Sequence, residues 1–277
     1  MTMLNLSGVP ETMLWTLHNR ASEALRADAI LHDPDAVRIY RSITYDYERS
    51  FGKPDASHAL RSRVFDDALK PWLLAHPGGT VVELACGLET QFQRCDDGQL
   101  RWLCVDVPEA IAARARFLPA SERCRHIAKS ALELSWMDEV DATRGVFVTA
   151  QGLFMYLEPT AVQRLVTAIV ERWAPSVELM FDAVPHWYTR RTLKGWYKTR
   201  DYRTPPMPWG ANRSELGPLL RRWSARIGTV EFVPWGYVRG AQAIVLRLAA
   251  KLPVLRDFVP VVVRVCTRRA DCSQPVA

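Results

Sequence analysis

The stretch VVELACGLETQ, residues 81–91, is a hydrophobic run that ends abruptly in a turn of small residues. Residues 80–84 predict a buried strand, although Glu83 interrupts its apolar character. In open parallel α/β sheets, ligands bind beyond the carboxyl ends of the strands, at the turns that follow them. A large side chain in such a turn would occupy the ligand's place, so Ala85 and Gly87 favour a cofactor loop. An ordinary strand end is the alternative that this motif alone leaves open.

Strands and helices alternate downstream of this stretch. A helix is expected at 57–76, and near-continuous apolar strands with helices between them predict a parallel sheet covered on both faces. The expected strands are 80–84, 101–107, 125–130, 145–152 and 176–184, with 229–238 and 258–269 as two further strands around a helix at 241–252. The sequence therefore predicts an α/β fold with a mostly parallel, seven-stranded sheet.

The segments outside this alternating region are of two kinds. The first 50 residues have apolar residues at helical spacing, and residues 186–210 are rich in Trp, Tyr, Arg and Pro, which indicates an insertion that covers a site. We therefore expect one domain over residues 1–277. Its expected parts are an N-terminal helical lid (1–54), a core (55–185), a lid or substrate insertion (186–225) and C-terminal strands (226–277).

Composition excludes several classes of protein. The net charge of +6 comes mostly from arginines spread along the chain, which favours an anionic small substrate over nucleic acid. No apolar run approaches twenty residues, and the N-terminus lacks the pattern of a secretory signal, so we expect a cytoplasmic protein without a membrane helix. The six cysteines show no CxxC spacing, so we expect free thiols and no metal site.

The second expected strand ends in Asp106, twenty-three residues after Glu83. An acidic residue at about this spacing accepts hydrogen bonds from the two ribose hydroxyls of an adenosyl cofactor. The turn has lost the glycines that a pyrophosphate requires, which disfavours NAD. S-adenosylmethionine (SAM) has no phosphate and needs no such cradle.

Several motifs occur in a defined order along the chain. They are SGVPETMLWTLHNRASEA, LHDPDAVRIY, ALRSRVFDDAL, VVELACGLETQFQR, LCVDVPEAIAAR, SALELSWMD and VFVTAQGLFMYLEP. Over about residues 7–165 this order resembles the leucine carboxyl methyltransferase family, above all its bacterial polyketide O-methyltransferase branch of the tetracenomycin type. The resemblance implies the Rossmann-like fold of class I methyltransferases, with SAM as methyl donor.

The resemblance also implies residues of the cofactor site. Arg61 would bind the methionyl carboxylate, with Arg63 as a rival two residues on, and Arg20 would reach the same group. The other predicted cofactor residues are Glu83, Ala85, Gly87, Asp106, Val107, Ser130, Ala131, Leu132 and Gln151. Several family members have an aspartate where Ser130 stands, so this chain departs from the family at the contact with the adenine amino group. Gln151 stands where the family motif usually has glutamate, so it keeps hydrogen-bonding ability but loses the charge.

The implied function is O-methylation of a carboxylate or phenol on a polyketide-like molecule. A carboxylate is ionised at neutral pH and needs no general base, whereas a phenol would benefit from one. The catalytic candidates are Tyr156 and His186, and the acceptor candidates are Tyr156, Trp187, Tyr188, Arg191, Trp196 and Tyr197. The expected partner is an acidic, aromatic small molecule, bound by a monomer or homodimer. Two alternatives are a carboxyl methyltransferase acting on a protein C-terminus and a SAM-binding protein without transfer activity.

Overall fold

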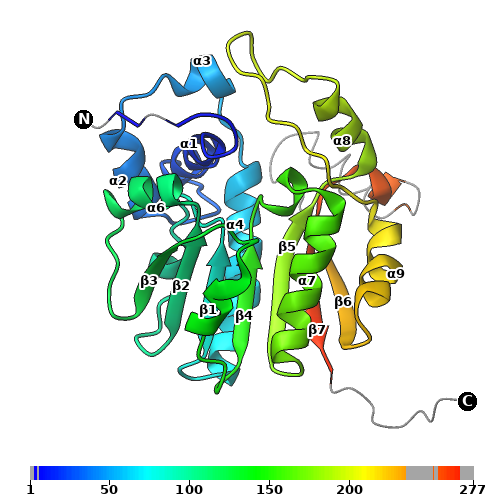
Figure 1. The fold of residues 1–277 in the computed structure, drawn as a ribbon. Coiled ribbons are helices and arrows are strands. Elements are labelled where there is room, and N and C mark those ends of the chain that lie inside the picture. The colour runs from blue at the N-terminus through cyan, green and yellow to red at the C-terminus, as the bar shows by residue number, and fades with distance from the viewer. Residues whose placement is uncertain (1–2, 5, 235–251, 253–254, 269–277) are drawn as a thin grey trace, which may run out of the picture.

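A computed structural model shows a seven-stranded sheet with helices on both faces (Figure 1). It describes residues 3–4, 6–234, 252 and 255–268. The strand order is β3-β2-β1-β4-β5-β7-β6; the first five strands are parallel, and β7 is antiparallel to both β5 and β6. The strands are β1 (Thr80–Leu84), β2 (Arg101–Asp106), β3 (Cys124–Ala128), β4 (Val146–Ala150), β5 (Val177–Ala183), β6 (Ile227–Pro234) and β7 (Val261–Thr267).

Nine α-helices lie within the described residues. They are α1 (Thr12–Ala24), α2 (Pro34–Ser42), α3 (Tyr47–Phe51), α4 (Ser57–Ala75), α5 (Gln91–Cys95), α6 (Pro108–Ala115), α7 (Pro159–Trp173), α8 (His186–Leu193) and α9 (Arg213–Trp223). Alternate residues of β1 and β2 face opposite layers, because side chains along a strand point to opposite faces. Val82 and Leu103 belong to the core layer that includes α7 and α9, whereas Val81 and Trp102 belong to the layer that includes α4, α5 and α6.

The N-terminal helices form a separate apolar cluster above the carboxyl ends of β1 and β2. Leu14, Leu17 and Ala21 of α1 are fully buried against α2, α3 and α6. Figure 1 shows α1 to α3 on one side of this edge, with α8 and the segment after it on the other. The two segments that the sequence separates by more than 130 residues thus flank the same edge of the sheet.

The seven strands agree with the sequence-based prediction to within a few residues at each end. The last two strands reverse their order in space, since β7 inserts between β5 and β6. The helices α5, α8 and α9 were not predicted, and the helix expected at 241–252 falls almost wholly outside the described residues. The division of the chain into lid, core and insertion stays a prediction.

Candidate active site

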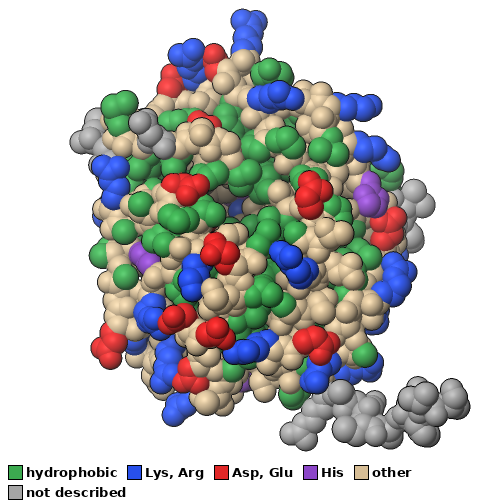
Figure 2. Space-filling model, in the orientation of Figure 1, with side chains coloured by type: hydrophobic (Ala, Val, Ile, Leu, Met, Phe, Trp, Pro, Cys, Tyr) green, Lys and Arg blue, Asp and Glu red, His purple; other side chains and the backbone are tan. Residues whose placement is uncertain are grey.

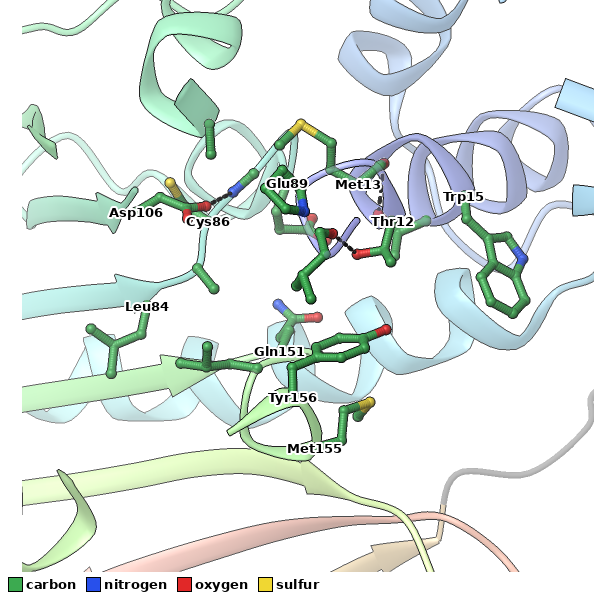
Figure 3. A pocket seen from close by; sticks show the side chains of 18 of the residues that line it. Thr12, Met13, Trp15, Leu84, Cys86, Glu89, Asp106, Gln151, Met155 and Tyr156 are labelled. Atoms are coloured by element: carbon green, nitrogen blue, oxygen red, sulfur yellow. Dashed lines mark hydrogen bonds between the residues drawn. The ribbon is translucent and has the colours of Figure 1, made fainter. Parts of the chain in front are cut away.

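A cavity of about 570 Å³ lies at the carboxyl ends of β1, β2 and β4 (Figure 3). Its size is typical of a small-molecule site. Asp106 and Trp15 lie at opposite ends of the view, with Gln151 and Tyr156 between them. Polar groups from the strand ends surround the Asp106 end, and aromatic side chains from α1, α8 and the insertion surround the other. We call these the strand-end half and the aromatic half.

The turn after β1 supplies backbone to the strand-end half. Ala85 and Gly87 both have positive φ, 54° and 42°. A β-carbon on Gly87 would lie 3.1 Å from Cβ of Met13 on α1, so the close approach of this helix requires glycine there. Ala85 carries the left-handed conformation despite its β-carbon. The small residues are therefore needed both for the conformation of the turn and for its close packing.

Asp106 joins this turn to the end of β2. Its Oδ2 accepts a hydrogen bond from the Gly87 amide at 2.8 Å, and its Oδ1 accepts one from the Val107 amide at 2.8 Å. Burial raises the pKa of Asp106 to about 6, although both hydrogen bonds oppose the shift. The carboxylate thus lines the cavity in a fixed orientation and is ionised above that pH.

Arg61, and not Arg63, faces the cavity. Arg61 is buried, and its Nη1 donates to Oδ2 of Asp182 at 3.0 Å. A β-carbon on Gly152, whose φ is 67°, would lie 3.0 Å from the same Nη1, so glycine allows the guanidinium to approach the turn after β4. Arg63 is exposed on the other side of α4, where it pairs with Asp67 at 3.5 Å. The geometry therefore favours Arg61 over Arg63, and the contact of Arg61 with the methionyl carboxylate stays a prediction.

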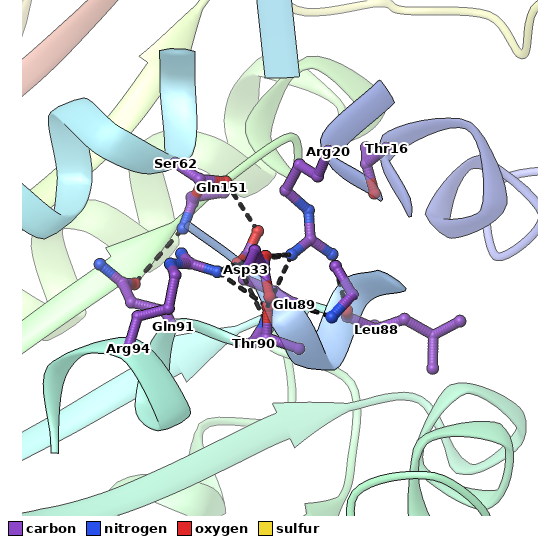
Figure 4. A network of polar contacts seen from close by, with 12 residues as sticks. Thr16, Arg20, Asp33, Ser62, Leu88, Glu89, Thr90, Gln91, Arg94 and Gln151 are labelled. Carbon is purple, nitrogen blue, oxygen red and sulfur yellow. Dashed lines mark hydrogen bonds and ion pairs between the residues drawn. The ribbon is translucent and has the colours of Figure 1, made fainter. Parts of the chain in front are cut away.

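Arg20 lies outside the cavity lining, in a buried network of ion pairs (Figure 4). Its Nη1 donates to Asp33 at 2.8 Å and to Glu89 at 3.1 Å, and its Nη2 donates to the Leu88 carbonyl at 2.7 Å. Burial opposes ionisation of Glu89, but Arg20 and Arg94 lower its pKa to about 2. The geometry does not support the expected role as a SAM ligand, because Arg20 contacts the loop that follows the turn and its guanidinium is already shared among protein acceptors.

The remaining cofactor candidates line the cavity. They are Glu83, Val107, Ser130, Ala131, Leu132 and Gln151. Glu83 accepts a hydrogen bond from Trp102 Nε1 at 3.1 Å, and burial raises its pKa. Gln151 donates from Nε2 to Gln91 at 3.3 Å, whereas its Oε1 is shielded from solvent and has no partner among the described residues. This orphaned acceptor is available to a donor on a bound ligand.

The aromatic half contains three of the six acceptor candidates. Tyr156, Tyr188 and Trp196 line the cavity. Burial raises the pKa of Tyr156, so this phenol keeps its proton and can donate a hydrogen bond. Trp187 and Tyr188 are neighbours on α8 and so point in different directions: Trp187 donates from Nε1 to the Phe258 carbonyl at 2.9 Å, away from the cavity.

Three further candidates also lie away from the cavity. Arg191 lies over the ring of Trp196, 4.7 Å from its centroid, and Tyr197 is 58% exposed. His186 pairs with Glu215 at 2.7 Å near the surface, so its position does not support the expected catalytic role. All three belong to the outer side of α8 and the insertion, and the sequence pattern did not predict which way these side chains point.

Sequence reasoning missed several residues of the aromatic half. Trp15, His58, Lys198, Met155 and Met207 line it. The Lys198 ammonium lies 5.0 Å from the centre of the Trp15 ring and so adds a cation to the aromatic wall. His58 could have been found from its spacing, because a residue three positions before Arg61 lies on the same face of the helix.

Sequence reasoning also missed a cluster of possible metal ligands on the neighbouring strands β2 and β3. Ligand atoms of Cys104, Cys124 and His126 lie within 4.8 Å of one another, and the two sulfurs are 3.8 Å apart. The residues are on β2 and β3, with Cys104 opposite His126 in the register. Strand pairing brings them together, which the search for CxxC spacing did not test.

The outer surface shows no dominant charge on the face drawn in Figure 2. Lysine, arginine and acidic side chains are interspersed, and hydrophobic side chains gather around a hollow in the upper half. Within the described residues, no helix is both long and apolar enough to cross a membrane.

Comparisons with known proteins agree with this geometry. A family model described as leucine carboxyl methyltransferase matches residues 13–170. The chain is 34% identical over 190 residues to the tetracenomycin polyketide synthesis O-methyltransferase TcmP of Streptomyces glaucescens. This alignment covers 68% of this chain and 70% of that protein. The chain is also 29% identical over 202 residues to the S-adenosyl-L-methionine-dependent methyltransferase dpfgK of Gibberella zeae. That alignment covers 65% of this chain and 67% of dpfgK.

A solved structure of a putative methyltransferase from Thermobifida fusca superposes with a TM-score of 0.54. The superposition covers 91% of this chain and 94% of that one at 14% identity, so it shows the fold alone. The expected class I methyltransferase fold is confirmed.

Proposed function

The chain belongs to the leucine carboxyl methyltransferase family and is a SAM-dependent O-methyltransferase, and we propose that it methylates a carboxylate on an aromatic, polyketide-like small molecule. The observation that carries the choice of carboxylate is the lack of a suitable base among the described residues of the aromatic half. Burial lowers the pKa of His58 to about 3 and raises that of Tyr156. Burial opposes ionisation of Asp55, but His58, Ser57 and Lys198 outweigh it and lower the pKa of this carboxyl group. None of these groups would readily take a proton from a phenol near neutral pH, whereas a carboxylate has none to lose.

The strand-end half fits SAM. Gln151 Oε1 is an orphaned acceptor, the turn at Ala85 and Gly87 leaves room for a ligand, and Asp106 offers both carboxylate oxygens. Asp106 would hold the ribose hydroxyls, Arg61 the methionyl carboxylate, and Ser130, Ala131 and Leu132 would flank the adenine. When bound there, SAM supplies a methyl group on a positively charged sulfur.

The chain's own residues then orient the acceptor. SAM would supply its methyl group to an oxygen of the acceptor, and the electron pair of the broken carbon–sulfur bond would stay with the sulfur of S-adenosylhomocysteine. The walls of the aromatic half, Trp15, Tyr188 and Trp196, suit a flat ring system, and Lys198 suits its negative charge. Alignment of this kind can contribute about 7–11 kcal/mol to lowering the barrier.

One acceptor that carries both nucleophiles tests the proposal. 3-Hydroxy-2-naphthoic acid has a carboxylate beside a phenol on a flat ring system. Incubation with SAM should give the methyl ester, identified by mass spectrometry and by its lability to alkali. 2-Naphthol, which lacks the carboxylate, should not react.

Other products would contradict the proposal in distinguishable ways. Formation of the aryl ether would make the phenol the nucleophile. Methylation of peptide C-termini alone would favour a protein acceptor. SAM binding in calorimetry without turnover of any acceptor class would favour a binding protein.

A further inference from the structure

Two cysteines and a histidine lie together on one face of the sheet, at its β3 edge. Cys124 and His126 are two positions apart on β3, so their side chains point to the same face. His126 pairs in register with Cys104 on β2, and both cysteines belong to the core layer that includes α4, α5 and α6. The pairing of two neighbouring parallel strands therefore holds the three side chains in place.

The spacing of the two sulfurs matches that of two ligands on one metal ion. Sγ of Cys104 and Sγ of Cys124 are 3.8 Å apart, and a ring nitrogen of His126 lies within 4.8 Å of both. Two thiolates that each lie about 2.3 Å from a tetrahedral Zn²⁺ are also about 3.8 Å apart. A disulfide bond would need about 2.05 Å, so the side chains fit a shared metal ion better than a covalent bond.

The donor set is the one that zinc prefers. Thiolate and imidazole are its usual protein ligands, whereas Mg²⁺ and Ca²⁺ take oxygen. Both cysteines are buried free thiols. The Nε2 atom of His126 is shielded from solvent and has no hydrogen-bond partner among the described residues, so the protein leaves this ring partly unsatisfied.

The charges around the cluster suit a metal with two thiolate ligands. Two thiolates balance the charge of Zn²⁺ and a neutral imidazole adds none, so the buried centre as a whole carries no charge. Arg114 is fully buried, and its positive charge interacts with both cysteines. Such a cation favours thiolates, the form that binds a metal. Glu83 lies 4.0 Å from Arg114 and gives this cation an acidic neighbour of its own.

We propose that Cys104, Cys124 and His126 bind one Zn²⁺ ion through two thiolates and one imidazole nitrogen. Binding breaks the two S–H bonds; each sulfur keeps the electron pair and donates it to the metal, and the two protons go to solvent. Water is the fourth ligand of the tetrahedral ion. Because His126 is only half-buried and β3 ends the strand order, the ion has a short path from solvent.

The ion cross-links the edge of the sheet beside the cofactor site. Asp106 follows Cys104 by two residues on β2, where it pairs with Ala128 of β3. The three ligands themselves lie outside the cavity lining. The metal therefore stabilises the β2–β3 pair that carries Asp106 and takes no part in methyl transfer.

Cobalt substitution tests the site in the full chain, without SAM or acceptor. Co²⁺ added to reduced, chelator-treated protein should give the near-ultraviolet charge-transfer band of thiolate-bound cobalt, and Zn²⁺ should remove the band by displacement. Cys124→Ser should halve the band per bound cobalt. His126→Gln should keep both thiolates. Each variant should weaken the affinity for Co²⁺ by more than the roughly 10- to 100-fold that loss of a residue beside a metal ligand costs.

Cys266→Ser is the matched control. It removes a half-buried thiol from β7, away from the cluster, and should change neither the band nor the affinity. Hydrogen exchange tests the structural role: Zn²⁺ should slow exchange of the β3 amides in the wild-type protein and leave those of β6, at the other end of the strand order, unchanged. Cys124→Ser should show no such slowing.

The outcomes are distinguishable. Wild-type protein that gives no cobalt band overturns the proposal, and so does a band that persists in His126→Gln with unchanged affinity, whether or not Cys124→Ser folds. A band that disappears in Cys266→Ser would place the metal elsewhere. Because no measurement uses SAM or an acceptor, failure here leaves the proposed methylation standing, and failure of the methylation assay leaves the metal site standing.

Discussion

Replacement of Arg20 by methionine should destabilise the protein without removing a direct ligand of SAM. Arg20 is fully buried, and the variant would lose its hydrogen bonds to Asp33, Glu89, Thr90 and the Leu88 carbonyl. Removing one partner of a buried ion pair typically costs about 3–5 kcal/mol. Arg94 still pairs with Asp33 and Glu89, each at 2.9 Å, so we expect the lower end, about 3 kcal/mol.

Urea unfolding followed by tryptophan fluorescence measures this loss. Arg63→Met is the matched control, because the exposed Arg63–Asp67 pair should contribute about 0–1 kcal/mol. The low pKa of Glu89, about 2, adds a signature in pH: its contribution to stability is present above pH 4.5 and is lost as the pH falls toward 2, and it should shrink in Arg20→Met. A variant that loses less than about 1 kcal/mol of stability, yet loses SAM binding, would refute the argument and make Arg20 a direct ligand.

Three further predictions concern the two halves of the cavity. Because the ionised Asp106 would accept from the ribose and its pKa is about 6, SAM affinity in calorimetry should fall about tenfold per pH unit below that value, and Asp106→Asn should bind weakly at all pH values; pH dependence retained in Asp106→Asn would exclude this carboxylate. Arg61→Lys should weaken SAM binding by about tenfold or more because lysine cannot form a bidentate pair, whereas Arg63→Lys should have no effect; the reverse would contradict the position of Arg61. Trp196→Ala should raise the KM of the acceptor more than that of SAM, whereas Trp187→Ala should leave both within about twofold in steady-state assays; equal shifts for Trp196→Ala would indicate a role in packing alone.

The sequence predicted the strand-end half better than the aromatic half. The strands read as apolar runs because helices cover both faces of the sheet, and the positions of Ala85, Gly87 and Asp106 follow from the strand ends alone. In contrast, the direction of Trp187 and Tyr188 depends on how α8 packs, and adjacent helical residues point about 100° apart. A pattern rich in aromatic residues therefore located the wall of the cavity, and the fold determined which of its members face inward.

The contacts around α1 indicate which wall of the cavity can move. α1 supplies Met13 to the turn after β1, Asn19 to His58 and Arg20 to the buried network, so displacing it would break buried ion pairs worth several kcal/mol. The tip of the insertion meets α3 through an exposed ion pair, Arg49 with Asp201 at 3.1 Å, and through the buried Tyr202, whose ring lies edge-on to Phe51 at a centroid distance of 4.8 Å. The exposed ion pair contributes about 0–1 kcal/mol, and burial of the aromatic side chain about 1.5–3 kcal/mol. We therefore infer that displacing the insertion around residues 196–203 costs less than displacing α1, so that access to the aromatic half depends first on this insertion.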